Sequence, residues 1–266
     1  MALIVGGLLA GVSTLLKDQQ EEQVALDKQK QILSSVMSLD GVENVQALYG
    51  ERITAYVVNI DGDRVETELP AEDIDIAKEF KNKKDPAERL YPVFEFKGES
   101  GQTEAYILPV FGNGLWDNIW GFVALDTDGN TIKGVSLDHA GETPGLGARI
   151  TTADVQERFA GKEVFNEAGE VVAVTMLKGE GNPESMLDEH HINGMSGATI
   201  TGNGVSAMMK NYMSHYESFI KKATGGAGMS MEPAPATDSL ASTDTLQAAV
   251  ADMAVEKMEE ETGESH

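Results

Sequence analysis

The hydroxyl groups of Ser196 and Thr199 are the best candidates for chemistry in this sequence, and they bracket the stretch Ser196-Gly-Ala-Thr199. Small residues surround them and leave room for a bulky ligand near the backbone, namely Gly194, Gly197, Ala198, Gly202 and Gly204. An amphipathic segment at 205–220 follows and predicts a helix. Because a helix N-terminus offers free N–H groups and a positive dipole end, the stretch suits a phosphorylated ligand. Its composition alone favours a simpler interpretation, a glycine-rich turn with a helix cap.

Two other glycine-rich loops, at 112–116 and 141–147, lie near the ends of predicted strands, and Trp116 and Trp120 are close to the first of them. Together with 194–204, these loops could line one cleft for a flat ring that carries a phosphate tail. Alternatively, they are three independent turns. Neither loop has the glycine spacing of a dinucleotide-binding fingerprint or of a Walker motif.

The three histidines His139, His190 and His191 do not have the spacing of a metal site. No helix places two of them at i and i+4, and adjacent residues of a strand point to opposite faces. Ser196 also lacks the Gly-x-Ser-x-Gly pattern of a hydrolase nucleophile. We therefore expect neither a bound metal nor a catalytic residue.

The composition excludes several other classes of site. The 266 residues include no cysteine, which rules out disulfides, thiolate catalysis and cysteine-ligated metal clusters. The formal net charge is −24, with 44 acidic against 20 basic residues, and no basic stripe interrupts it. Such a chain repels the phosphate backbone, so nucleic acid is not an expected partner.

The elements that must position these loops are mostly strands. Alternating apolar residues predict strands at 91–96 and 104–111, and a hairpin of 119–126 with 131–138 across the turn Asp126-Thr-Asp-Gly-Asn130. The same type of pattern predicts a short helix and a strand within 42–58, a charged helix or loop at 71–84, a helix at 152–159 and a strand at 170–177. The expected fold class is α+β, with a single mixed α/β domain that contains antiparallel sheet elements.

The two ends of the chain differ from this domain. Residues 2–16 carry no charge, which favours an N-terminal transmembrane anchor at 1–16 over a signal peptide or a buried helix. A polar helix then predicts a stalk at 17–40, followed by the globular domain at 41–224. The acidic residues that follow the anchor favour a globular domain on the non-cytoplasmic side of the membrane. The acidic segment 225–266 has few large apolar residues, so we expect a disordered tail with at most a short helix at 246–258.

Taken in order, the motifs resemble those of a known family. The chain resembles the C subunit of the Na⁺-translocating NADH:quinone oxidoreductase over about residues 1–222. The motifs that carry the resemblance are Leu26-Asp-Lys-Gln-Lys30, Gly114-Leu-Trp116, Gly141-Glu-Thr-Pro-Gly-Leu-Gly147 and Ser196-Gly-Ala-Thr199. The last motif alone marks a wider class of FMN-binding domains. The alternatives are therefore the G subunit of an Rnf-type ferredoxin:NAD oxidoreductase, a free-standing FMN-domain reductase, or, in a different class, a non-redox membrane-tethered module that binds a ligand noncovalently.

The resemblance implies that FMN is joined through its phosphate to Thr199 by a flavin transferase, which uses FAD and Mg²⁺. It implies that the flavin relays single electrons in a Na⁺-translocating membrane complex and that the other subunits and the lipid bilayer are partners. It further implies a single-pass protein of a bacterial inner membrane with a periplasmic FMN domain. The ring would lie against Glu142, Thr143, Leu146 and Gly147, with Leu115, Trp116 and Lys178 as further neighbours and with Ser196, Gly197 and Ala198 completing the site.

One residue departs from the family pattern. The attachment motif usually begins with Asp six residues before the threonine, and this chain has Asn193 there. Asparagine keeps the shape and the hydrogen bonding of aspartate but loses its charge. If the carboxylate helps to position Mg²⁺ during the transfer, attachment of the flavin to this chain is expected to be slower or to need a variant transferase.

Overall fold

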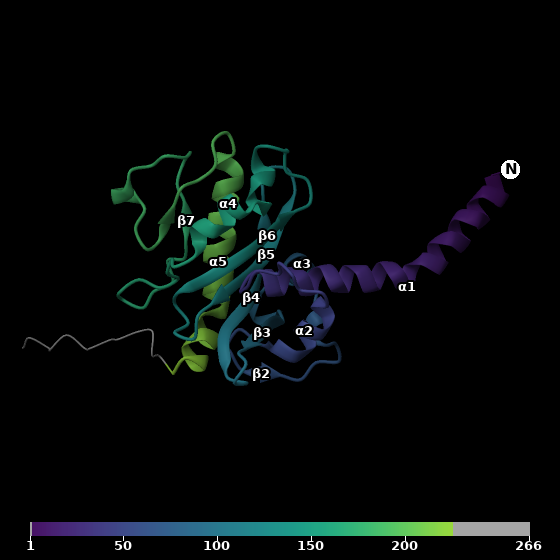
Figure 1. The fold of residues 1–266 in the computed structure, drawn as a ribbon, viewed down its shortest axis with the longest axis horizontal. Helices are drawn as coiled ribbons and strands as arrows, with labels where there is room; N and C mark the ends of the chain where they lie inside the picture. Colours follow the sequence, from purple (N-terminus) through teal and green to yellow (C-terminus); the bar gives the residue numbers. More distant parts are fainter. Residues whose placement is uncertain (1, 226–266) are drawn as a thin grey trace, which may run out of the picture. The chain divides into compact units, whose positions relative to one another are not determined.

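A computed structural model of the chain describes residues 2–225, with side chains from residue 17 onward. Its centre is a six-stranded sheet in the order β2-β1-β3-β4-β5-β6, and every neighbouring pair is antiparallel (Figure 1). The strands are β1 (Ile53–Val58), β2 (Arg64–Val65), β3 (Tyr91–Lys97), β4 (Thr103–Asn113), β5 (Asn118–Leu125) and β6 (Ile132–His139). The predicted mixed α/β domain with an antiparallel sheet is confirmed.

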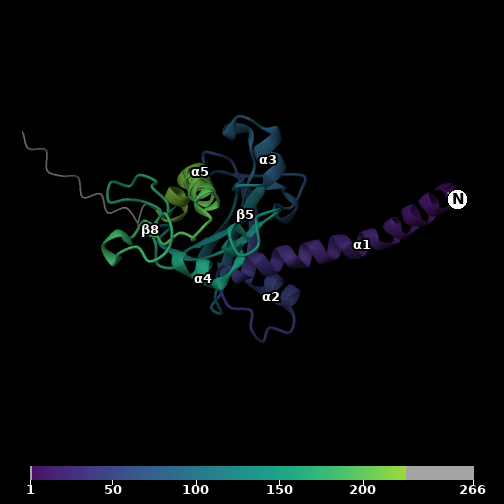
Figure 2. The ribbon, with the colours of Figure 1, turned by 90° about the horizontal axis from the view of Figure 1, so that it is seen from above.

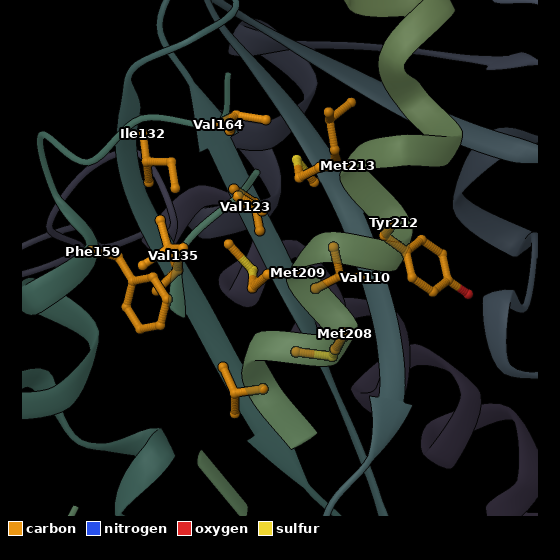
Figure 3. Packing of buried hydrophobic residues seen from close by; sticks show 14 of the residues in the cluster. Val110, Val123, Ile132, Val135, Phe159, Val164, Met208, Met209, Tyr212 and Met213 are labelled. Atoms are coloured by element: carbon orange, nitrogen blue, oxygen red, sulfur yellow. The ribbon is translucent and has the colours of Figure 1, made fainter. Parts of the chain in front are cut away.

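The 25-residue helix α5 (Thr199–Ala223) covers one face of the sheet. Its buried residues recur at helical spacing, and Met208, Met209 and Met213 point towards the strands, where Val110, Val123 and Val135 meet them (Figure 3). Every second residue of β4 and β5 faces this helix. The packing therefore fixes α5 lengthwise on the sheet and places its N-terminus at one edge of the core.

Helix α1 (Ala2–Ser34) reaches the opposite face of the sheet with its last turns (Figure 2). Ile32 and Leu33 are fully buried there against Phe94 and Phe122. The Gln31 amide donates to Asp138 on β6 at 2.9 Å, which fixes the helix across that strand. Helix α2 (Val45–Arg52) packs in the same cluster and leads into β1, as the pattern at 42–58 predicts.

Helix α1 continues without a break through the expected boundary between the anchor (1–16) and the stalk (17–40). In the part of the chain that the structure describes, none of the helices is both long and apolar enough to cross a membrane. The predicted tail at 225–266, with its short helix, lies outside the described residues except for Gly225.

Two predicted elements are wrong in length. The region 152–159 forms only α4 (Ala153–Gln156) and a 3₁₀ turn at Glu157–Phe159. The region 170–177 contains only the two-residue strand β7 (Thr175–Met176), which pairs in parallel with β8 (His191–Ile192). Ala173 has a φ of 55°, and this left-handed residue interrupts the extended backbone. Val171, Ala173 and Val174 of this apolar run are buried all the same, so its hydrophobicity reports burial and not a strand.

The remaining short elements join these parts. Helix α3 (Ile76–Asn82) lies in the charged region 71–84, with Asp75 as its N-cap. Further 3₁₀ turns cover Ala71–Asp73, Pro86–Glu88, Gly147–Thr151 and Glu184–Met186. The turn at 126–130 joins β5 to β6 as predicted, with Gly129 at a positive φ of 72°.

Candidate functional site

Thr199 is the first residue of α5, so its hydroxyl lies at the positive end of a long helix. The chain enters the helix through a tight turn in which Ala198 N–H donates to the Met195 carbonyl and Gly197 has a φ of 77°. Ala198 occupies the N-cap position and has no side-chain oxygen to cap the helix. No residue that the structure describes accepts a hydrogen bond from the N–H groups of Thr199, Ile200 or Thr201. The arrangement leaves donors for an anion beside the Thr199 hydroxyl.

The three glycine-rich loops meet at the carboxylate of Glu142. Oε2 of this carboxylate accepts a hydrogen bond from the Thr201 hydroxyl at 2.6 Å. Oε1 accepts one from the Trp116 N–H at 3.0 Å. The loop after β4, the loop after β6 and the start of α5 are therefore joined by one side chain. The structure thus brings together the loops that the sequence also allowed to be independent turns.

Two glycines make room for this carboxylate. A Cβ atom on Gly114 would lie 2.3 Å from Glu142 Oε1, and a Cβ atom on Gly147 would lie 2.3 Å from Oε2 and 2.6 Å from Thr201 Oγ1. Real Cβ contacts are never this short, so both positions require glycine if the carboxylate stays in place. The glycines of these loops thus serve the packing around Glu142.

Glu142 is buried, with 4% of its surface exposed. Burial by itself raises the pKa of a carboxyl group, but hydrogen bonds from the Thr201 hydroxyl and from the N–H groups of residues 115–117 outweigh it. They hold the pKa of Glu142 below its ordinary value of 4.5. The side chain is therefore a carboxylate at neutral pH.

An exposed apolar rim surrounds the N-terminus of α5, formed by Leu115, Trp116, Leu146 and Ile200, which are 43%, 69%, 41% and 58% exposed. Leu146 lies over Gly197, where an added Cβ would be 2.9 Å from Leu146 Cδ2. The Trp116 indole donates to the Thr143 hydroxyl at 3.1 Å and so joins two loops at the surface. Only three other large apolar side chains are comparably exposed in residues 17–225, and such a concentration is typical of a ligand surface.

Ile200 is the member of this rim that the sequence did not reveal. It falls outside the phase of the buried positions of α5, which begin with Thr201, Gly202 and Val205. A large apolar residue that is out of phase next to the Ser196–Thr199 motif is the signal that could have identified it.

A polar network lies beside the motif. Arg149 and Arg158 both bind Glu180, at 2.7 and 3.3 Å, and both bind Asp154. Hydrogen bonds from Arg149 and Arg158 lower the pKa of Glu180 to about 2. Arg158 also donates to the carbonyls of Asn193 and Gly194, so the network supports the turn that carries Thr199. Isolated charges in the sequence gave no indication of this arrangement.

Asn193 uses its side-chain oxygen within the protein. Oδ1 accepts hydrogen bonds from the backbone N–H and from the side-chain amide of Asn182, both at 2.9 Å. Because a backbone N–H can only donate, the atom that faces it must be the oxygen. Asn193 therefore anchors the loop 179–182 to the segment that precedes Thr199.

The structure separates the predicted site residues into three groups. Thr143, Leu146, Leu115, Trp116 and the stretch 196–199 lie at or next to the surface around the start of α5. Glu142 and Gly147 lie beneath that surface, and their place against the ring stays a prediction. Lys178 is exposed on the loop after β7 and makes no side-chain hydrogen bond or ion pair with any described residue.

The histidines make separate contacts. The Glu142 N–H donates to His139 Nδ1 at 3.2 Å, which fixes the loop after β6. His190 contacts the Glu163 carbonyl, and His191 pairs with Asp188. Within the described residues there is no cluster of three or more potential metal ligands.

Comparisons with known proteins agree with this site. The FMN-binding domain family matches residues 114–214, a range that contains the loops 141–147 and 194–204, residues 114–116 of the first loop and most of α5. The C subunit of the Na(+)-translocating NADH-quinone reductase from Haemophilus ducreyi is 37% identical over 222 residues, which cover 79% of this chain and 84% of the relative. The corresponding protein from Neisseria meningitidis serogroup A is 36% identical over 226 residues, with coverage of 77% and 83%.

Solved structures give the same result. The crystal structure of the Na(+)-translocating NADH-quinone reductase C subunit from Parabacteroides distasonis has a TM-score of 0.66 at 34% identity and covers 77% of this chain and 96% of that one. NqrC of Shewanella oneidensis has a TM-score of 0.65 at 28% identity, with coverage of 75% and 97%. The shared fold, the coverage of most of both chains and the family match over residues 114–214 lead to one assignment. The chain belongs to the C-subunit family of the Na⁺-translocating NADH-quinone reductases.

Proposed function

We propose that this chain is an electron-transfer subunit of a membrane NADH:quinone oxidoreductase and that it holds FMN at the N-terminus of α5, joined through the phosphate to Thr199. The observation that carries the proposal is the position of Thr199, at an uncapped helix start within an exposed apolar rim. Membership of the C-subunit family supports the same assignment. Coupling to Na⁺ belongs to the complex as a whole.

The residues present fit a phosphorylated flat ring. The free N–H groups at residues 199–201 and the dipole of α5 suit the phosphate. The exposed side chains of Leu115, Trp116 and Leu146 offer apolar surface for the ring within reach of the same helix start. Donors for the phosphate and apolar surface for the ring therefore occur side by side.

When bound, FMN supplies one-electron chemistry, and the protein contributes binding, orientation and the local electric field. Leu115, Trp116, Leu146 and Ile200 would shield one part of the ring from water. The Arg149–Arg158–Glu180 network and Asn193 would hold the turn that carries the Thr199 hydroxyl. No side chain is assigned as an acid or a base, so we propose no catalytic residue in this chain.

The proposed partners are the other subunits of the complex and, during maturation, a flavin transferase that must reach the Thr199 hydroxyl. We also propose the single-pass topology suggested by the uncharged residues 2–16, with the FMN domain on the periplasmic side of the inner membrane. Protease treatment of spheroplasts checks this topology. Digestion of the domain at 41–224 only after lysis would contradict the periplasmic placement.

The central experiment is coexpression of the chain with its flavin transferase, followed by intact-mass analysis and in-gel flavin fluorescence under denaturing conditions. The wild-type chain is expected to carry one FMN, and Thr199→Ala is expected to carry none. Ser196→Ala is the matched control, because it removes a hydroxyl from the same turn without removing the attachment atom. An unmodified wild-type chain beside a transferase that labels another substrate would overturn the proposal.

Two alternatives have their own outcomes in this experiment. Copurification of ferredoxin-linked partners would favour an Rnf-type G subunit, whereas partners that oxidise NADH and reduce quinone support the proposal. A colourless protein after coexpression with an active transferase would favour a noncovalent binding module.

A further inference from the structure

We infer that Glu142 is a positioning residue of this site, whose buried carboxylate joins the three loops around the start of α5 and lowers the reduction potential of a flavin held by them. The second half of this inference rests on the proposed FMN function. The first half concerns the chain alone.

The carboxylate of Glu142 contacts two distant segments of the chain, and its backbone contacts the end of the preceding strand. The loop after β4 supplies the Trp116 N–H, α5 supplies the Thr201 hydroxyl, and His139 at the end of β6 accepts from the N–H of Glu142 itself. Hydrogen bonds to a charged group are stronger than those between neutral groups. The carboxylate therefore fixes the positions of the loops that carry Leu115, Trp116 and Leu146 relative to Thr199.

The space around the carboxylate is closed on two sides. Gly114 approaches Oε1 and Gly147 approaches Oε2 so closely that neither glycine can carry a Cβ atom without moving the carboxylate. The side chain is thus held between two backbones in this packing. Its 4% exposure agrees with a side chain that supports the site from below and does not touch a ligand.

The charge of Glu142 has no cationic partner among the residues that the structure describes, because none of the ion pairs includes this carboxylate. The hydrogen bonds stabilise the charge without neutralising it. A buried negative charge acts over a longer distance than a solvated one, since the surrounding dielectric constant is lower. It opposes the addition of an electron to a group bound on the same loops, which corresponds to a lower reduction potential.

Two variants separate the charge of Glu142 from its support of the loops. In Glu142→Gln the amide oxygen can still accept from the N–H groups of residues 115–117, and the amide nitrogen can donate to the Thr201 hydroxyl. This variant removes the charge with little change of shape. Glu142→Ala removes all of the side-chain contacts, and Thr201→Val removes one of them without changing the charge.

The charge is tested by redox titration of the flavin-loaded full chain. Glu142→Gln is expected to keep its FMN and to shift the midpoint potential to a more positive value. Glu157→Gln is the matched control, because Glu157 is an exposed carboxylate whose charge is screened by water, so its removal should leave the potential unchanged. A flavin-loaded Glu142→Gln with the wild-type potential would refute the electrostatic part.

The support of the loops is tested without flavin, by hydrogen–deuterium exchange of the full chain in the Thr199→Ala background. Glu142→Ala and Thr201→Val are expected to increase exchange at residues 114–118, while Thr175→Val, an exposed threonine elsewhere, leaves it unchanged. Unchanged exchange in Thr201→Val and in a folded Glu142→Ala would refute this part. A wild-type chain that accepts no FMN would refute the proposed function and the electrostatic part, and the exchange experiment would still decide the role of Glu142 in the loops.

Discussion

The substitution Gly147→Ala tests the packing around Glu142 with the smallest possible change, one methyl group. The new Cβ atom would lie 2.3 Å from Glu142 Oε2 and 2.6 Å from Thr201 Oγ1, so both atoms of the 2.6 Å hydrogen bond must move to make room for it. No positive φ marks Gly147, so strain of the backbone does not confuse the result.

The magnitude follows from the interaction that is lost. A hydrogen bond to a charged group contributes about 1.5–3 kcal/mol, and a buried carboxylate that loses a donor bears a desolvation penalty of similar size. We expect the free energy of unfolding to fall by about 2–3 kcal/mol. For a domain of this size this corresponds to a decrease in the melting temperature of roughly 4–12 °C.

The assay is thermal and urea unfolding of the full chain, followed by circular dichroism. Gly141→Ala is the matched control in the same loop, because its Cβ atom would make an ordinary contact with Asp117 at 3.4 Å. This control should stay within about 0.5 kcal/mol of wild type. If Gly147→Ala is as stable as wild type, or if both variants lose the same stability, the packing of the carboxylate between the glycines is refuted.

The other predictions concern the turn, acid stability and the core. Asn193→Asp should accept FMN at the wild-type rate, because either side chain offers an oxygen to the Asn182 N–H, whereas Asn193→Ala should be slower. Timed in-gel fluorescence measures both rates, and a faster Asn193→Asp would show that the charge matters. The pKa of Glu142 is lowered on folding, so its contribution to stability is complete above pH 4.5 and decreases as the pH falls through the folded-state pKa. The urea midpoint should therefore fall less steeply with decreasing pH in Glu142→Gln than in wild type, and parallel curves would contradict this. Tyr216→Phe should lower the free energy of unfolding by about 1–3 kcal/mol, because the buried Pro92 carbonyl loses its hydroxyl donor. Urea unfolding measures this loss, and a loss near zero would indicate another donor.

Local sequence patterns determined the elements whose burial follows a simple period. The strands from residue 91 to residue 139 and the helix after Ser196–Thr199 are regular elements with one face on a continuous core, so the alternation of residue types marks them directly. The order of the motifs also identified the family, because the residues that define it are contiguous in the chain. The pattern failed at 170–177, where Val171, Ala173 and Val174 are buried in an irregular segment and Ala173 turns the backbone.

Only the tertiary structure decided how the loops work together. The sequence placed Glu142 in a glycine-rich loop, and only the structure shows that its carboxylate is buried, with donors from Thr201 and Trp116, which are distant in the chain. The position of Ile200 in the apolar rim and the contact of Asn193 with Asn182 also depend on how distant segments pack together. A sequence records which side chains are available, but hydrogen bonds and close contacts between distant loops depend on positions that the whole core sets.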